Sequence, residues 1–91
     1  MKQVGLDDWQ VRAVVQFLQT QFPGRGVDHC TRGRVAELFH VSEAGRLLHQ
    51  LYVSRRFLDR ATDPSSLNDA LFTADIVGSM RSVGTTTVEL H

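Results

Sequence analysis

Side chains suited to binding DNA are concentrated in the middle third of the chain. Arginine pairs with phosphate oxygens and guanine edges, and glutamine can bond an adenine edge. Residues 31–60 hold six arginines against three acidic residues, whereas residues 61–91 hold one arginine against four, and the whole chain is neutral. The side chains that we expect at a DNA interface are Arg32, Arg34, Ser42, Glu43, Arg46, His49, Gln50, Arg55, Arg56 and Arg81. The alternative is that these arginines only solvate the outer faces of two helices, which is common.

Motifs for catalysis or metal binding are missing from the sequence. It has no Gly-x-Ser-x-Gly elbow, no His-Glu-x-x-His helix and no pair of Cys-x-x-Cys steps. His29 and Cys30 are adjacent but lack a second pair of metal ligands, and Cys30 is the only cysteine. We therefore expect no enzyme, no cofactor and no metal, and a free thiol at Cys30.

The elements that would position the arginines begin with a helix over residues 7–22. Asp7 or Asp8 can cap its start, because a carboxylate accepts free backbone N–H groups there. Val11, Val14 and Leu18 recur at helical spacing along one side. Pro23-Gly24 follows directly, and proline cannot continue the hydrogen-bond ladder. The segment thus predicts an apolar helix that ends near residue 22.

Two further helices are predicted over residues 31–39 and 42–60. Ser42 between them is a suitable N-cap, and Gly45 falls in the first turn of the second helix. Thr62-Asp63-Pro64 would end this helix, since proline disfavours helix in the residue before it. The apolar residues that recur at helical spacing are Val35, Leu38 and Phe39 in the first and Ala44, Leu47, Leu48 and Leu51 in the second.

Beyond residue 70 the apolar period becomes two. Residues 71–77 and 85–90 alternate like half-buried strands, and the loop 78–84 between them would place Arg81 at the tip of a β-hairpin. A competing interpretation is a helix that starts at Ser66, since Leu67, Ala70, Leu71 and Ala74 also fit helical spacing. We favour the hairpin, because a strand over 85–90 needs a partner for its backbone groups.

The stretch from Arg34 to Leu51 resembles the DNA-binding unit of winged helix-turn-helix transcriptional regulators. The resemblance implies an α+β fold in one domain over residues 1–91, with a three-helix core followed by a C-terminal β-hairpin wing. It also implies a small bacterial or phage regulator whose third helix enters the major groove of double-stranded DNA while the wing contacts the backbone. The core would then hold Trp9, Val14, Phe17, Leu18, Leu38, Leu48, Leu51, Phe72 and Val88.

Length and composition limit the remaining choices. A membrane-spanning helix needs about 20 consecutive apolar residues, and no apolar run in the sequence approaches that length. Met1–Gly5 lack the apolar core of a signal peptide. We therefore expect a cytoplasmic protein without membrane contact. A chain this short buries only a modest core, so we also consider that it forms a homodimer. The alternative function is a winged-helix module that binds a protein partner, which the neutral net charge and the acidic C-terminal third favour.

Overall fold

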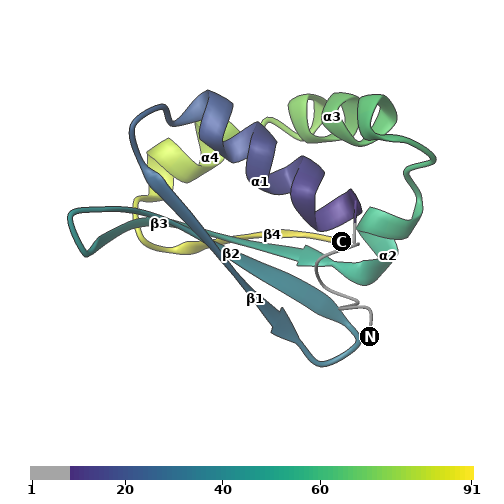
Figure 1. Cartoon of the computed structure of the whole chain (residues 1–91), viewed down its shortest axis with the longest axis horizontal. Coiled ribbons are helices and arrows are strands. Elements are labelled where there is room, and N and C mark those ends of the chain that lie inside the picture. The colour runs from purple at the N-terminus through teal and green to yellow at the C-terminus, as the bar shows by residue number, and fades with distance from the viewer. Residues whose placement is uncertain (1–8) are drawn as a thin grey trace.

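A mixed sheet with helices on one side forms the fold of this chain in a computed structural model, which describes residues 9–91 (Figure 1). The elements are α1 (Trp9–Gln21), β1 (Gly26–Arg32), β2 (Ala36–Glu43), β3 (Arg46–Ser54), α2 (Arg55–Asp59), α3 (Pro64–Thr73), α4 (Ile76–Val83) and β4 (Thr87–Leu90). The strand order is β1-β2-β3-β4, with antiparallel pairs except for β4, which runs parallel to β3. The predicted α+β class is confirmed.

The first helix is confirmed over the described residues, and its caps at Asp7 or Asp8 lie outside them. Helix α1 ends at Gln21, and Gly24 takes a positive φ of +79° in the turn that follows. Helices α1, α3 and α4 lie over the same side of the sheet (Figure 1). None of the helices within residues 9–91 is long and apolar enough to cross a bilayer.

The helix-turn-helix predicted over residues 31–60 is wrong, because these residues form the end of β1, the strands β2 and β3, and the short helix α2. Ala36, Glu37, Leu38 and Phe39 are all buried, in a strand that lies between β1 and β3. Such a strand does not alternate between apolar and polar residues, so its apolar run fits helical spacing equally well. The only helix in residues 42–60 is α2, which spans five residues.

The predicted helix start at Ser42 is replaced by a tight hairpin turn. Glu43 pairs with Arg46 across it, and the two residues between them, Ala44 and Gly45, both have positive φ angles of 52° and 79°. Two-residue turns of this kind match the twist of antiparallel strands. The N-cap lies instead at Ser54, whose hydroxyl accepts a hydrogen bond from the amide of Phe57.

The C-terminal hairpin is also wrong, and the competing helix is correct. Asp63 caps α3 by accepting from the Ser66 amide at 2.7 Å, while the Ser66 hydroxyl accepts from the amide of Asp63. A break at Asp75, with φ of 52°, separates α3 from α4. The strand predicted over residues 85–90 is confirmed for 87–90, but its partner is β3. The arrangement of three helices followed by a wing is therefore not confirmed.

Most of the predicted core is confirmed. Val14, Phe17, Leu18, Leu38 and Leu51 are buried, and Trp9, Leu48 and Val88 are half-buried. The prediction that Phe72 belongs to the core is wrong, because this residue is 56% exposed. In helix α3 the side chains of Leu67 and Leu71 point toward the core. Phe72 follows Leu71 directly, so its side chain points away from the buried side of the helix.

Candidate nucleic-acid interface

The structure separates the ten predicted site residues into two ends of the sheet and a middle region. Arg32, Arg34, Arg55 and Arg56 lie at the end formed by the β1–β2 turn and the start of α2, which we call the arginine end. Ser42, Glu43 and Arg46 lie at the opposite end, at the β2–β3 turn. His49, Gln50 and Arg81 contact residues of other segments between these ends. The ten residues therefore do not form one surface.

Backbone pairing brings the members of the arginine end together. Arg32 pairs with Ala36, and Ala36 pairs with Ser54, so these residues form one row across three strands. The amide of Arg55 donates to the carbonyl of Val35 at 2.7 Å, which holds the start of α2 against the β1–β2 turn. Two segments that are 20 residues apart in sequence thus bring their arginines to the same place.

A buried carboxylate positions Arg55 and with it the start of α2. Glu37 is 5% exposed and faces the helices. Its carboxylate accepts from the Thr31 hydroxyl at 2.9 Å and from Nη1 of Arg55 at 3.3 Å, and it also contacts the ring of His29. Arg55 Nη2 donates to Gln10 of α1 at 2.6 Å. This cluster joins two strands to two helices, so it supports the fold beneath the arginine end.

The remaining arginines of this end face solvent. Arg32, Arg34 and Arg56 are exposed, and within residues 9–91 none of them forms a salt bridge with an acidic side chain. Arg60, one turn after Arg56, donates to the carbonyl of His91 at 2.8 Å. The positive charge of Arg55 is compensated by Glu37 and by Asp59 at 3.8 Å, whereas no acidic side chain in the described part of the chain forms a salt bridge with the three exposed arginines.

A hollow of about 410 Å³ opens beside these arginines. Its lining consists of Val35, Tyr52, Ser54, Arg55, Arg56 and His91. The Tyr52 and His91 rings lie 5.5 Å apart at a 48° tilt. The lining therefore combines two rings, a hydroxyl and guanidinium groups, which are groups that contact the phosphates, sugars and bases of nucleic acids.

The other predicted residues are engaged elsewhere. Glu43 forms a salt bridge of 3.0 Å with Arg25. Gln50 Nε2 donates to the carbonyl of Thr85 at 2.8 Å, which secures the segment before β4. Arg81 lies over the Phe22 ring at 5.5 Å and donates to the carbonyl of Gln21 at 3.4 Å. These contacts favour a structural role for Gln50 and Arg81.

Sequence analysis did not single out Tyr52, Ser54 and His91 for this interface. In Tyr52-Val53-Ser54 the apolar Val53 is buried in the core, and its two polar neighbours point to the opposite face of β3; this alternation was the available signal. The same alternation separates His29 from Cys30. His29 faces Glu37 on the helix side, so Cys30 points to the opposite face, and the two side chains are not placed to bind one ion. Within residues 9–91 no group of three potential metal ligands is found.

Comparison of this chain with protein-family models, with curated proteins and with solved structures found no match. The description of the candidate interface therefore depends only on the residues of this chain. These are three exposed arginines on two adjoining segments, an aromatic hollow between them, and a buried carboxylate that holds the segments together.

Proposed function

We propose that this chain binds double-stranded DNA through the arginine end. The observation that supports this function is that Arg32, Arg34 and Arg56 lie exposed at one end of the sheet, where Arg56 lines an aromatic hollow, and that none of the three has an acidic partner among the described residues. Guanidinium groups form bidentate hydrogen bonds with phosphate oxygens, so three of them at one end of the sheet suit a sugar-phosphate backbone.

The contacts follow from the placement of each arginine. Arg34 lies in the β1–β2 turn, which projects beyond the sheet, and would contact one strand of the duplex. Arg56 lies across the hollow and would contact a neighbouring phosphate. Tyr52, which lines the hollow, would contact a sugar. Residues 42–60 supply no long helix to a major groove, so the expected binding depends mainly on the backbone.

The neutral net charge is compatible with this function because the charges are segregated. Of the acidic residues of the C-terminal third, Asp63, Asp69 and Asp75 lie on or beside α3 and α4, away from the β1–β2 turn, whereas Glu89 of β4 lies 3.0 Å from a ring nitrogen of His91 beside the hollow. A local positive field attracts DNA even when the sum over the chain is zero. Regulation of transcription stays part of the proposal as a role that duplex binding can serve, since the helix-turn-helix that first suggested it is not found in the fold.

Salt dependence of binding to a labelled duplex tests the proposal. The logarithm of the association constant should fall with the logarithm of salt concentration by about 0.9 per phosphate contact. Two or three contacts per chain give a slope of about −2 to −3. Arg34→Ala and Arg56→Ala should each weaken binding to all duplexes alike and reduce the slope by about one unit.

Arg46→Ala is the matched control, because Arg46 is equally exposed but lies at the opposite end of the sheet. It removes the same charge and should leave both affinity and slope unchanged. The proposal fails if Arg46→Ala has the same effect as Arg34→Ala, since binding would then reflect net charge alone. It also fails if no duplex binds at low salt.

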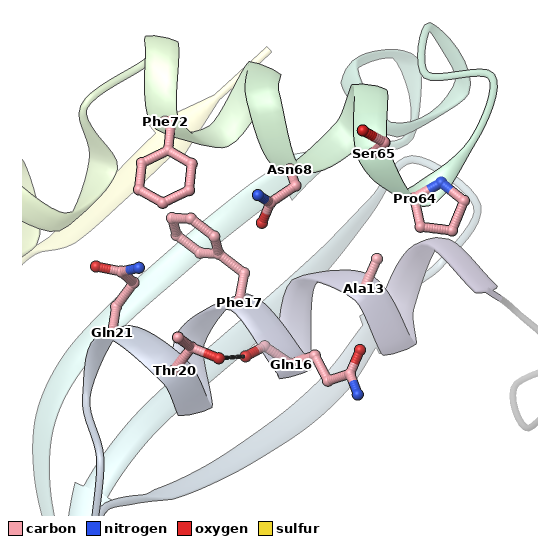
Figure 2. A pocket seen from close by; sticks show the side chains of 9 residues that line it. All are labelled: Ala13, Gln16, Phe17, Thr20, Gln21, Pro64, Ser65, Asn68 and Phe72. Carbon is pink, nitrogen blue, oxygen red and sulfur yellow. Dashed lines mark hydrogen bonds between the residues drawn. The ribbon is translucent and has the colours of Figure 1, made fainter.

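A second candidate is binding of a partner protein at a groove between α1 and α3. Figure 2 shows Phe72 and Phe17 facing each other across this groove, with Gln16, Thr20 and Gln21 on its α1 side. The two phenyl rings meet edge to face at 5.0 Å, the groove encloses about 480 Å³, and Phe72 is 56% exposed. A largely exposed phenylalanine beside a groove is typical of sites for apolar segments. Phe72→Ser should leave DNA affinity unchanged if the arginine end is the DNA site.

A further inference from the structure

Among residues 9–91, no segment pairs with the outer edge of β1, which we call its free edge. β1 is the outermost strand of the sheet and spans seven residues, whereas the other edge strand, β4, spans four. Natural edge strands are usually protected by proline, bulges or charged side chains, above all lysine. β1 has no proline, bulge or lysine, and its charged residues are Asp28 and Arg32, which can pair with each other across two antiparallel copies. The irregularity in this meander lies between β2 and β3, at Val41 and Ser42.

The β1–β2 turn fixes which backbone groups of β1 point outward. The carbonyl of Arg32 accepts from the amide of Val35 at 3.4 Å, so the backbone groups of Arg32 are directed toward the β2 side. In an antiparallel ladder these directions alternate along a strand. The backbone N–H and C=O groups of Val27, His29 and Thr31 are therefore directed to the free edge.

We propose that two copies of this chain form a dimer by antiparallel pairing of their β1 strands about a two-fold axis at Cys30. This inference goes beyond the proposed DNA binding and shares only Arg32 with it. The axis places His29 opposite Thr31 of the second copy, so their outward backbone groups form ladder hydrogen bonds. It also joins the two four-stranded sheets into one continuous sheet.

Charge complementarity selects this register. Asp28, Cys30 and Arg32 lie on one face of β1, and all three are exposed. An axis at Cys30 places Asp28 of each copy opposite Arg32 of the other, which gives two opposite-charge pairs. An axis at Asp28 or at Arg32 would place like charges opposite each other, which is destabilising. An axis at His29 or Thr31 makes no Asp–Arg pair within β1.

The same register brings the two Cys30 thiols together. Residues opposite each other at a non-hydrogen-bonded position have Cα atoms about 4.5 Å apart. Disulfides form at Cα separations of about 4.4–6.8 Å. Cys30 therefore serves as a reporter of the register, because diamide can oxidise two facing thiols to a disulfide while being reduced itself. Arg32 serves the pairing in the dimer, and Arg34 and Arg56 stay available to DNA.

Sedimentation velocity with charge-swapped variants tests the dimer and its register. The native chain should sediment as a dimer, and diamide should convert it to a covalent dimer that Cys30→Ser cannot form. Asp28→Arg alone and Arg32→Asp alone should each weaken dimerisation by roughly tenfold or more, because each creates like-charge pairs. An equimolar mixture of these two variants should restore the dimer as a heterodimer.

Arg46→Asp is the control, since it makes the same charge change outside β1 and should leave the dimer intact. Circular dichroism confirms that each variant folds, and the mixture keeps the test decisive even if one variant is less stable. A native chain that stays monomeric at near-millimolar concentration overturns the inference. A dimer that neither single swap weakens, or one that the mixture fails to restore, overturns it as well. DNA binding without dimerisation would contradict only this inference.

Discussion

The carboxylate of Glu37 lies 3.3 Å from Nη1 of Arg55, so a buried acid of β2 holds the first residue of α2. The Glu37 side chain is 6% exposed and that of Arg55 is 27% exposed. Glu37 also accepts from Thr31 at 2.9 Å, which adds β1 to the same cluster. Because the start of α2 carries Arg56, this cluster fixes the arginine end relative to the sheet.

Replacing Glu37 with glutamine should destabilise the fold. The substitution keeps the shape but removes the charge that Arg55 and Thr31 bond, and hydrogen bonds to charged groups contribute about 1.5–3 kcal/mol. Because Arg55 is partly solvated, we expect a loss of about 1–2 kcal/mol in urea unfolding. Glu43→Gln, at a salt bridge with Arg25 whose side chains are 38% and 48% exposed, should cost less than about 0.5 kcal/mol. Equal losses for the two variants would show that the Glu37 cluster does not stabilise the fold.

Substitutions at two adjacent positions of the β2–β3 turn should have opposite effects on the stability of the protein. Ala44 has a φ of 52°, which asparagine tolerates better than alanine, so Ala44→Asn should stabilise the protein by about 0.5–1 kcal/mol. Gly45 has a φ of 79°, so Gly45→Ala should destabilise it by about 1 kcal/mol. Thermal melts of both variants check the two signs. A helix at residues 42–60 would instead make Gly45→Ala stabilising, and that result would contradict the hairpin.

The cap of α3 should contribute measurably to stability. Asp63 accepts from the amide of Ser66 at 2.7 Å, and loss of such a cap typically costs about 0.5–2 kcal/mol. Asp63→Ala should therefore lower the melting temperature. Asp69→Ala removes the same charge from an exposed position inside α3 and should not lower it. A lower melting temperature for Asp69→Ala would indicate a charge effect instead of capping.

Leu51 should be among the most sensitive core positions. It is fully buried on β3, opposite Phe39 of β2 and Val88 of β4. Leu51→Ala should cost about 2–5 kcal/mol in chemical denaturation, because the cavity that remains cannot close completely. Leu47→Ala, at a half-buried position of the same strand, is the comparison and should cost less. A melt unchanged by Leu51→Ala would place the centre of the core elsewhere.

The sequence determined the first helix and the last strand well. Helix α1 combines a helical apolar period with a Pro-Gly stop, and both signals are local. The strand β4 shows clear alternation. Its partner was not predictable, because β4 pairs in parallel with β3 across three intervening helices, and such pairing leaves no local signal.

The middle of the chain was mispredicted because burial removed the alternation. Ala36 to Phe39 are buried on both sides of β2, so the segment matched a helical pattern. The Ala44-Gly45 turn lacked the Asn-Gly or Asp-Gly pair that usually marks a two-residue hairpin. The arginine end was predicted in part, since Arg32, Arg34, Arg55 and Arg56 do gather. Their common location depends on the backbone pairing of Val35 with Arg55, which the sequence alone does not show.

Amide shift mapping by NMR during titration with a short DNA duplex at low salt tests the central claim most directly. Binding through the arginine end predicts that signals of residues 32–35 and 52–56 shift with increasing DNA, while those of residues 43–46 stay in place. The residues at the opposite end serve as the internal control, because they include the equally exposed Arg46. Shifts confined to the α1–α3 groove around Phe17 and Phe72, equal shifts at both ends of the sheet, or no shifts at all would contradict the account.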